Sequence, residues 1–294
     1  MTAWGSPGIR LVALVVLLAL AGRALASEAD WPRMTPSADG VPIAYEVRGT
    51  GEPTLVLVHG WSCDARYWRA QLPHLTPHHR VVTLDLAGHG HSGLGREHYD
   101  MAAFGEDVKA VVDDLGAERV ILVGHSMGGA VSVEAAHLMQ ERVIGIVGVD
   151  TFHDVGMTLT QAQLDDWLAP LQADFPAGAS EFVAQMFIEQ SDPALRDWVV
   201  ADMSAAPPRV ALGAFEALMA AQVNGDAAQR FAALAVPVVA INADLWPTDI
   251  EANRGHLPGF EAVILEESDH FLHMARPEAF NPELMRAITA MMAD

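Results

Sequence analysis

The residue best placed to act as a nucleophile is Ser126, in the stretch Gly124-His-Ser-Met-Gly128. The apolar run 120–123 before it predicts a buried strand, and residues 130–139 after it place apolar side chains largely on one side of a predicted helix. A strand that turns at once into a helix leaves no room for side chains beside the turn. Glycines therefore flank the turn and Ser126 is held out at its tip, as in the G-x-S-x-G nucleophile elbow.

A serine hydroxyl is a weak nucleophile until a base takes its proton, and a neutral imidazole suits that task near neutral pH. The chain has 13 histidines, and we take His270 as the candidate base. It follows the last predicted strand. His273 is close in sequence, but the aspartate before His270 and the phenylalanine after it favour His270.

Attack on a carbonyl creates an oxyanion, which needs two preorganised N–H donors. The backbone N–H of Met127 is the first candidate, because Met127 follows the nucleophile and opens a helix whose N-terminus favours negative charge. The loop that follows the predicted strand 54–58 should supply the second.

These residues must be positioned by a sheet. Apolar or alternating runs predict strands that are separated by helical stretches such as 101–115 and a terminal helix from about residue 277. The predicted strands are 41–47, 54–58, 81–84, 120–123, 143–149, 237–242 and 261–265. This alternation predicts an α/β fold with a doubly wound, mostly parallel sheet, whose ligands gather at the carboxyl ends of the strands.

Between about residues 152 and 230 the strand pattern stops and helical segments rich in Ala, Leu, Phe, Met and Trp take over. We interpret 152–230 as a helical cap inserted into a core formed by 27–151 and 231–294. Some of its large apolar side chains are expected to line a pocket above Ser126. These side chains are Trp167, Phe175, Phe182, Met186, Phe187, Trp198, Phe215 and Met219.

Four motifs together resemble the α/β-hydrolase superfamily, in its cap-bearing branch of esterases, lactonases, haloperoxidase-like enzymes and carbon–carbon bond hydrolases. They are His59-Gly-Trp61, Asp85-Leu-Ala-Gly-His-Gly-His-Ser92, Gly124-His-Ser-Met-Gly128, and Asp269-His-Phe271 with Pro277-Glu-Ala-Phe-Asn281 behind it. The resemblance runs from about residue 41 to the C-terminus. It implies a Ser, acid, His order along the chain with Ser126 and His270 as two members. It also implies that the backbone N–H of Trp61 is the second oxyanion donor.

The carboxylate that should orient His270 is where the sequence departs from this family. After the strand at 238–241 the family pattern has a Gly-x-x-Asp-like loop, whereas this chain has Asn242-Ala-Asp-Leu-Trp-Pro-Thr-Asp249. A shortened loop makes Asp244 our slightly preferred acid. Asp150, at the end of the preceding strand, is the alternative that some relatives use. Asp249 ranks third, because it is well placed to cap the helix that begins near residue 250.

Composition limits the partners. The formal net charge of −21 argues against binding to nucleic acid or anionic lipid, which require a basic surface, and favours neutral or apolar small molecules, here an ester-like substrate. Cys63 is the only cysteine, so no internal disulfide forms, and no motif calls for a metal or organic cofactor. The oligomeric state has no signal in the sequence.

The first 26 residues have the pattern of a secretory signal peptide. Arg10 precedes the apolar run 11–21, and Ala24-Leu-Ala26 fits an A-x-A cleavage site. The run is too short to span a bilayer as a helix. We therefore expect a secreted or periplasmic protein without a membrane anchor once the signal is cleaved.

Together these features predict a serine hydrolase that cleaves a carboxylic ester or lactone of a small apolar molecule through an acyl-enzyme. The same catalytic residues could instead serve carbon–carbon bond hydrolysis, acyl transfer or peracid formation, which the elbow does not distinguish. A non-catalytic protein that binds a small ligand in the same pocket is the alternative from another class.

Overall fold

The computed structural model describes residues 32–293, so the predicted signal peptide lies outside the described residues. Within this range the strands form one eight-stranded sheet in the order β1-β2-β4-β3-β5-β6-β7-β8. The strands are β1 (Arg33–Pro36), β2 (Pro42–Arg48), β3 (Thr54–Val58), β4 (Val81–Leu84), β5 (Val120–His125), β6 (Val143–Val149), β7 (Val238–Ala243) and β8 (Glu261–Leu265). No helix in the same range is both long and apolar enough to cross a membrane.

The sheet is mostly parallel, as the sequence predicts. The pairs from β4 through β3, β5, β6 and β7 to β8 are all parallel, whereas β2 pairs with β4 in the antiparallel sense. The carboxyl ends of these parallel strands therefore meet at one edge of the sheet. Every residue that we expect to do chemistry follows one of those ends.

Helices cover both faces of the sheet because successive side chains of a buried strand point to opposite faces. In β3, Val56 and Val58 belong to the apolar cluster that includes α3 (Met101–Asp114) and α4 (Met127–Met139). Leu55 and Leu57 belong to a second cluster that includes α12 (Pro277–Ala293). Shorter segments are η1 (Ala65–Trp68), α2 (Leu72–Leu75), η2 (Gln140–Arg142), α10 (Ile250–His256) and α11 (Leu272–Ala275).

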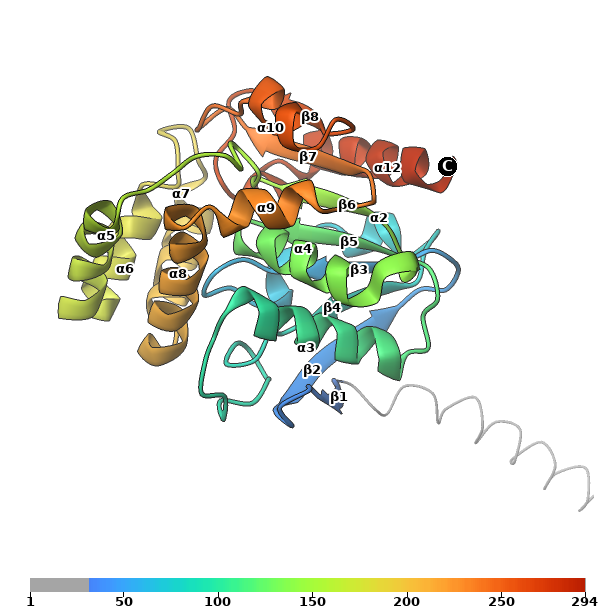
Figure 1. Ribbon diagram of the computed structural model, residues 1–294, viewed down its shortest axis with the longest axis horizontal. Coiled ribbons are helices and arrows are strands. Elements are labelled where there is room, and N and C mark those ends of the chain that lie inside the picture. The colour runs from blue at the N-terminus through green and yellow to red at the C-terminus, as the bar shows by residue number, and fades with distance from the viewer. Residues whose placement is uncertain (1–31, 294) are drawn as a thin grey trace, which may run out of the picture. The chain divides into compact units, whose positions relative to one another are not determined.

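Between β6 and β7 the chain is helical, as predicted. It forms α5 (Gln161–Ala173), α6 (Phe175–Ala184), α7 (Pro193–Ser204), α8 (Pro208–Val223) and α9 (Asp226–Ala232). Figure 1 shows α5, α6, α7 and α8 grouped at one end of the sheet, with α5 packed on α6 and α8. The boundaries of a cap at 152 and 230 stay a prediction.

Candidate active site

Ser126 occupies a strained turn between β5 and α4. Its φ of 53° and ψ of −120° lie outside the regions that non-glycine residues favour, a conformation that costs roughly 1–3 kcal/mol and is concentrated at functional sites. Two backbone hydrogen bonds hold it there: its N–H donates to the carbonyl of Val149 at 2.9 Å, and its carbonyl accepts from Gly129 at 2.9 Å. The strand–turn–helix arrangement predicted around this serine is confirmed.

The two motif glycines are required by the closeness of the backbone. A Cβ atom at Gly124 would lie 2.2 Å from the carbonyl oxygen of Gly128, and one at Gly128 would lie 2.3 Å from the carbonyl oxygen of Val58 in β3. Both distances are far below van der Waals contact, and the obstructing atoms are backbone atoms that no side-chain rotation can move.

Gly128→Ala is therefore expected to lower the free energy of unfolding by about 1–3 kcal/mol, because the added methyl group forces α4 away from β3. Urea denaturation followed by circular dichroism measures this loss. Gly213→Ala is the matched control, since its Cβ in α8 would lie 3.6 Å from the nearest atom and the change removes a helical glycine. A Gly128→Ala variant as stable as the control would contradict the packing argument.

His270 is paired with Asp150. The imidazole Nδ1 lies 2.5 Å from Oδ2 of Asp150, which follows β6, while His270 follows β8. The second carboxylate oxygen, Oδ1, accepts a hydrogen bond from the backbone N–H of Ala243 at 2.7 Å. The Asp150 side chain has no exposed surface, so this contact is shielded from water.

The charge on Asp150 decides what His270 can do. Burial of the carboxyl opposes ionisation, but interactions with His153 and His270 outweigh it, and the pKa of Asp150 lies below its usual value. Asp150 is thus a carboxylate at neutral pH and accepts the Nδ1 proton of His270. This tautomer leaves Nε2 of His270 free to receive a proton from a nucleophile.

Our preference for Asp244 as the partner of His270 does not agree with this geometry. Asp244 is exposed and accepts hydrogen bonds from the backbone N–H groups of Ser268 at 3.1 Å and Glu267 at 3.0 Å. The bond from Ser268 has the larger effect and the bond from Glu267 the next, and both lower the pKa of the Asp244 carboxyl. Asp244 therefore holds the turn that leads to His270. Asp249 caps α10 as expected, accepting from the N–H of Ala252 at 2.9 Å.

The loop after β3 lies against the elbow, as the oxyanion hypothesis requires. A Cβ atom at Gly60 would lie 3.2 Å from Cβ of Ser126, so the backbone that enters Trp61 passes directly beside the serine. Met127 is the first residue of α4. The structure thus brings both residues next to Ser126, and the role of their N–H groups as oxyanion donors stays a prediction.

The Trp61 side chain packs against the helices between β6 and β7. Its indole Nε1–H donates to the carbonyl of Ala211 in α8 at 2.7 Å. Its ring meets those of Phe175, Phe182 and Phe215 edge to face, with centroids 6.1, 5.8 and 5.7 Å away. These contacts dock α6 and α8 on the residue that follows Gly60, and a pocket lined by such side chains above Ser126 stays a prediction.

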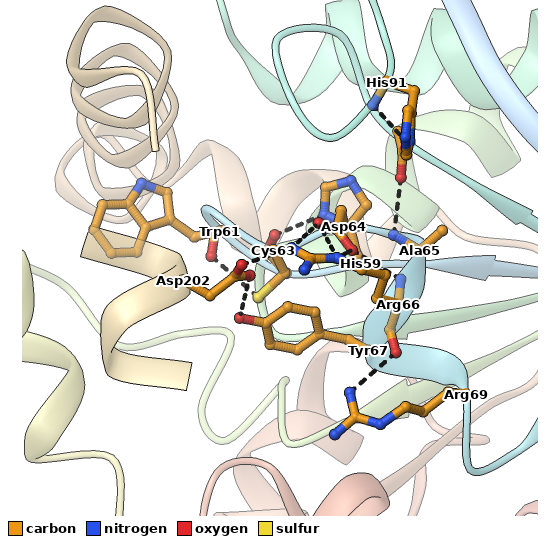
Figure 2. Close-up of polar contacts among 12 residues, drawn as sticks. His59, Trp61, Cys63, Asp64, Ala65, Arg66, Tyr67, Arg69, His91 and Asp202 are labelled. Carbon is orange, nitrogen blue, oxygen red and sulfur yellow. Dashed lines mark hydrogen bonds and ion pairs between the residues drawn. The ribbon is translucent and has the colours of Figure 1, made fainter. Parts of the chain in front are cut away.

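A polar contact also joins α7 to the segment after Trp61 (Figure 2). Asp202 of α7 accepts from Arg66 Nη2 at 2.6 Å and from the Tyr67 hydroxyl at 3.1 Å. Trp198, one turn earlier in α7, packs against the Tyr67 ring with centroids 5.0 Å apart. These contacts fix α7 over η1, which follows the loop of the predicted oxyanion donor.

The loop that carries His270 touches the insertion as well. The His270 N–H donates to the carbonyl of Met186 at 3.1 Å, and the Ser191 hydroxyl donates to Asp269 at 2.5 Å. Phe187 stacks on Phe271 with ring centroids 5.1 Å apart. The position of the candidate base therefore depends on segment 186–191 of the insertion, a link that the sequence does not reveal because it joins residues about eighty positions apart.

Sequence reasoning missed two neighbours of the Asp150–His270 pair. His153 places Nε2 at 3.8 Å from Asp150 Oδ2, and Trp246 packs edge to face on the His270 ring with centroids 5.2 Å apart. Trp246 occupies the position at which the family pattern has its acid, and this departure was the sequence signal that could have drawn attention to Trp246. His153 had no motif of its own.

Comparison with known proteins identifies chains that are similar to this one in sequence or in fold. A family model described as "alpha/beta hydrolase fold" matches residues 53–190, which include Ser126 and Asp150. The chain is 27% identical over 250 residues to a pimeloyl-[acyl-carrier protein] methyl ester esterase of Yersinia enterocolitica, covering 81% of this chain and 93% of that protein.

A second relative is the dihydrolipoyllysine-residue acetyltransferase component of the acetoin cleaving system of Pseudomonas putida. It is 41% identical over 102 residues, but the match spans 35% of this chain and only 28% of that protein. Among solved structures, a thermophilic esterase from Thermogutta terrifontis superimposes with a TM-score of 0.75 at 22% identity, covering 88% of this chain and 98% of that one. At that identity the likeness concerns the fold alone.

Proposed function

Because this chain belongs to the α/β-hydrolase superfamily, we propose that it is a serine hydrolase that cleaves a carboxylic ester or lactone of a small apolar molecule. The observation that carries the proposal is the buried Asp150–His270 pair at the sheet edge where Ser126 occupies its strained turn. A carboxylate that orients an imidazole, together with a serine at the same sheet edge, are the parts of an activated nucleophile.

In the proposed reaction the Ser126 hydroxyl oxygen attacks the carbonyl carbon of the ester while Nε2 of His270 takes the hydroxyl proton. The N–H groups of Trp61 and Met127 hold the oxyanion that forms. Collapse of this intermediate breaks the bond to the alcohol oxygen, which receives the proton from His270. Water then attacks the acyl-serine with His270 again as base. The bond between the acyl carbon and the Ser126 oxygen breaks, His270 returns its proton to that oxygen, and the carboxylic acid leaves. With a lactone, the alcohol stays attached to the acyl group.

Two features support an ester with an apolar acyl part. The loop after β3, which passes beside Ser126, carries the Trp61 ring into a cluster with three phenylalanine rings, and we therefore expect an apolar acyl pocket next to the nucleophile. The Yersinia enterocolitica relative is named as a methyl ester esterase and matches most of both chains. From the signal-like pattern before residue 27 we also propose that the mature enzyme works outside the cytoplasm.

The test is hydrolysis of p-nitrophenyl esters from acetate to long acyl chains by the mature protein and its Ser126→Ala variant. We expect turnover by the wild type and a fall in kcat of at least ~1,000-fold in the variant, because no other group replaces the nucleophile. Ser132→Ala is the matched control. It removes a hydroxyl in α4 that donates to the Gly128 carbonyl one turn earlier, and its kcat should stay within a few-fold of wild type.

The wild type should also react covalently with a fluorophosphonate probe at Ser126, which reports an activated serine without any choice of ester. Folded wild-type protein that neither reacts with the probe nor hydrolyses any ester of the series would overturn the proposal. Equal turnover by the wild type and Ser126→Ala would do the same.

A further inference from the structure

Two imidazoles, and not one, face the Asp150 carboxylate. Oδ2 contacts His270 Nδ1 at 2.5 Å, and Nε2 of His153 lies 3.8 Å from the same oxygen. The second distance is longer than a hydrogen bond, so in this structure the contact is electrostatic. Nε2 of His153 is buried and has no hydrogen-bond partner within residues 32–293. The acceptor that this atom faces at 3.8 Å is the carboxylate that orients the candidate base.

The neighbours of the other ring nitrogen determine where His153 carries its proton. Nδ1 lies 3.2 Å from the Thr248 hydroxyl and 3.4 Å from the Asn242 side-chain nitrogen. That amide is held in one orientation, because its oxygen accepts from the N–H of Thr151 and its nitrogen donates to the Thr151 carbonyl. Its two protons go to the Thr151 carbonyl at 3.0 Å and the Thr248 hydroxyl at 2.9 Å, so the amide nitrogen offers Nδ1 of His153 no acceptor for a proton.

The Thr248 hydroxyl leads to the same tautomer. Its oxygen accepts from the Asn242 amide at 2.9 Å, which leaves its own proton for Nδ1 of His153. Nδ1 of His153 thus accepts from Thr248, and the neutral ring carries its proton on Nε2, the atom that faces Asp150. Trp246 packs edge to face on His153 and on His270, with centroids 5.9 and 5.2 Å away, so one indole covers both rings.

We propose that His153 is a positioning residue of the active site, which holds the Asp150 carboxylate toward His270 and shares its negative charge. This inference rests on the proposed serine hydrolase function. His153 acts through Asp150 and takes no part in bond making or breaking. Its backbone is fixed independently of the ring, since its carbonyl accepts from the N–H of Asp249 at 2.7 Å.

Charge sharing has a consequence for pH. Without His153, the Asp150 carboxylate has His270 as the only imidazole against Oδ2, and it stabilises protonated His270 more strongly. The rate should then reach half its maximum at a higher pH, because His270 must lose its proton to act as base. A proton gained by His153 would act in the opposite direction by adding positive charge beside Asp150. Among the contacts of the His153 ring, Asp150 is ionisable, and Asn242, Thr248 and Trp246 are neutral. The ionisable neighbours of His270 include Asp150, the adjacent Asp269 and His125, whose ring centroid lies 4.7 Å away, and the His153 variants change none of them.

The experiment compares wild type, His153→Leu and His153→Gln in p-nitrophenyl acetate hydrolysis between about pH 5 and pH 9, beside the rate of fluorophosphonate labelling. We expect His153→Leu to lower kcat about 10-fold with KM unchanged, because the carboxylate loses one of the two imidazoles that hold it, and to raise the half-maximal pH. His153→Gln keeps an N–H donor near Asp150 and should recover kcat to within about three-fold of wild type.

His98→Leu, which changes an exposed histidine, is the control for loss of an imidazole as such. Two results would overturn the inference: wild-type kcat and pH profile in both His153 variants, or equal losses in both with an unchanged half-maximal pH, which would indicate packing alone. Failure of the proposed function looks different, because folded wild type would then show neither Ser126-dependent turnover nor labelling. If labelling occurs without ester turnover, the labelling rates of the same variants decide the inference.

Discussion

Asp150→Asn is expected to reduce kcat by about 10³- to 10⁴-fold, whereas Asp244→Asn should leave kcat within a few-fold of wild type. The asparagine amide at position 150 presents a donor or a weaker acceptor to His270 Nδ1. His270 then loses the tautomer in which Nε2 accepts a proton, and its protonated form loses the facing negative charge. At position 244 the amide oxygen still accepts one of the two backbone N–H groups from Glu267 and Ser268.

Steady-state kinetics with a p-nitrophenyl ester measure both variants, with circular dichroism as the check that each has folded. KM should change little in Asp150→Asn, because the carboxylate acts on the base and not on the acyl pocket. A deep loss in Asp244→Asn with near-normal activity in Asp150→Asn would return the role of the acid to Asp244. The pair separates the two candidates because each variant removes one charge and no volume.

Sequence patterns alone could not choose between these two carboxylates. Asp150 and Asp244 follow neighbouring parallel strands, β6 and β7, in which Val149 is paired with Ile241. Both therefore emerge at the same sheet edge within reach of the loop that carries His270. The choice depends on the backbone just after each strand. Asp150 has a φ of 46°, an uncommon value for a residue other than glycine, and no sequence motif predicts this backbone conformation.

The elements themselves were more predictable than their contacts. The predicted strand 120–123 extends to His125 and the helix expected at residue 130 begins at Met127, because the glycines allow the helix to start immediately after Ser126. The short strand β1 was missed, since prolines at positions 32 and 36 argue against a strand and its pairing with β2 is a tertiary effect. Helices in the insertion were expected from composition. Their docking on Trp61 and on the His270 loop was not, because no local pattern encodes contacts between distant segments.

Arg96→Met is expected to lower the free energy of unfolding by about 3–5 kcal/mol, because it leaves a buried carboxylate without its counter-ion. Asp107 of α3 has no exposed side-chain surface and is bonded by both terminal nitrogens of Arg96, whose side chain is 3% exposed. Ser37 and the N–H of Ala87 supply its other hydrogen bonds, at 2.5 and 3.0 Å. Methionine fills the space of the arginine stem without supplying a donor.

The pH dependence of that loss identifies its cause. Burial raises the pKa of the Asp107 carboxyl above its usual value even with Arg96 in place. Removing Arg96 raises this pKa further, so the folded variant binds a proton that the unfolded chain releases above about pH 4. Where the folded state holds more protons, stability falls as pH rises. The loss of unfolding free energy in Arg96→Met should therefore be largest near neutral pH and shrink toward pH ~4, as measured by urea unfolding.

The double variant Arg96→Met with Asp107→Leu, which removes both charges, should recover much of the loss at neutral pH and show no such pH dependence. A deficit of equal size at both pH values would instead point to lost packing of the arginine side chain.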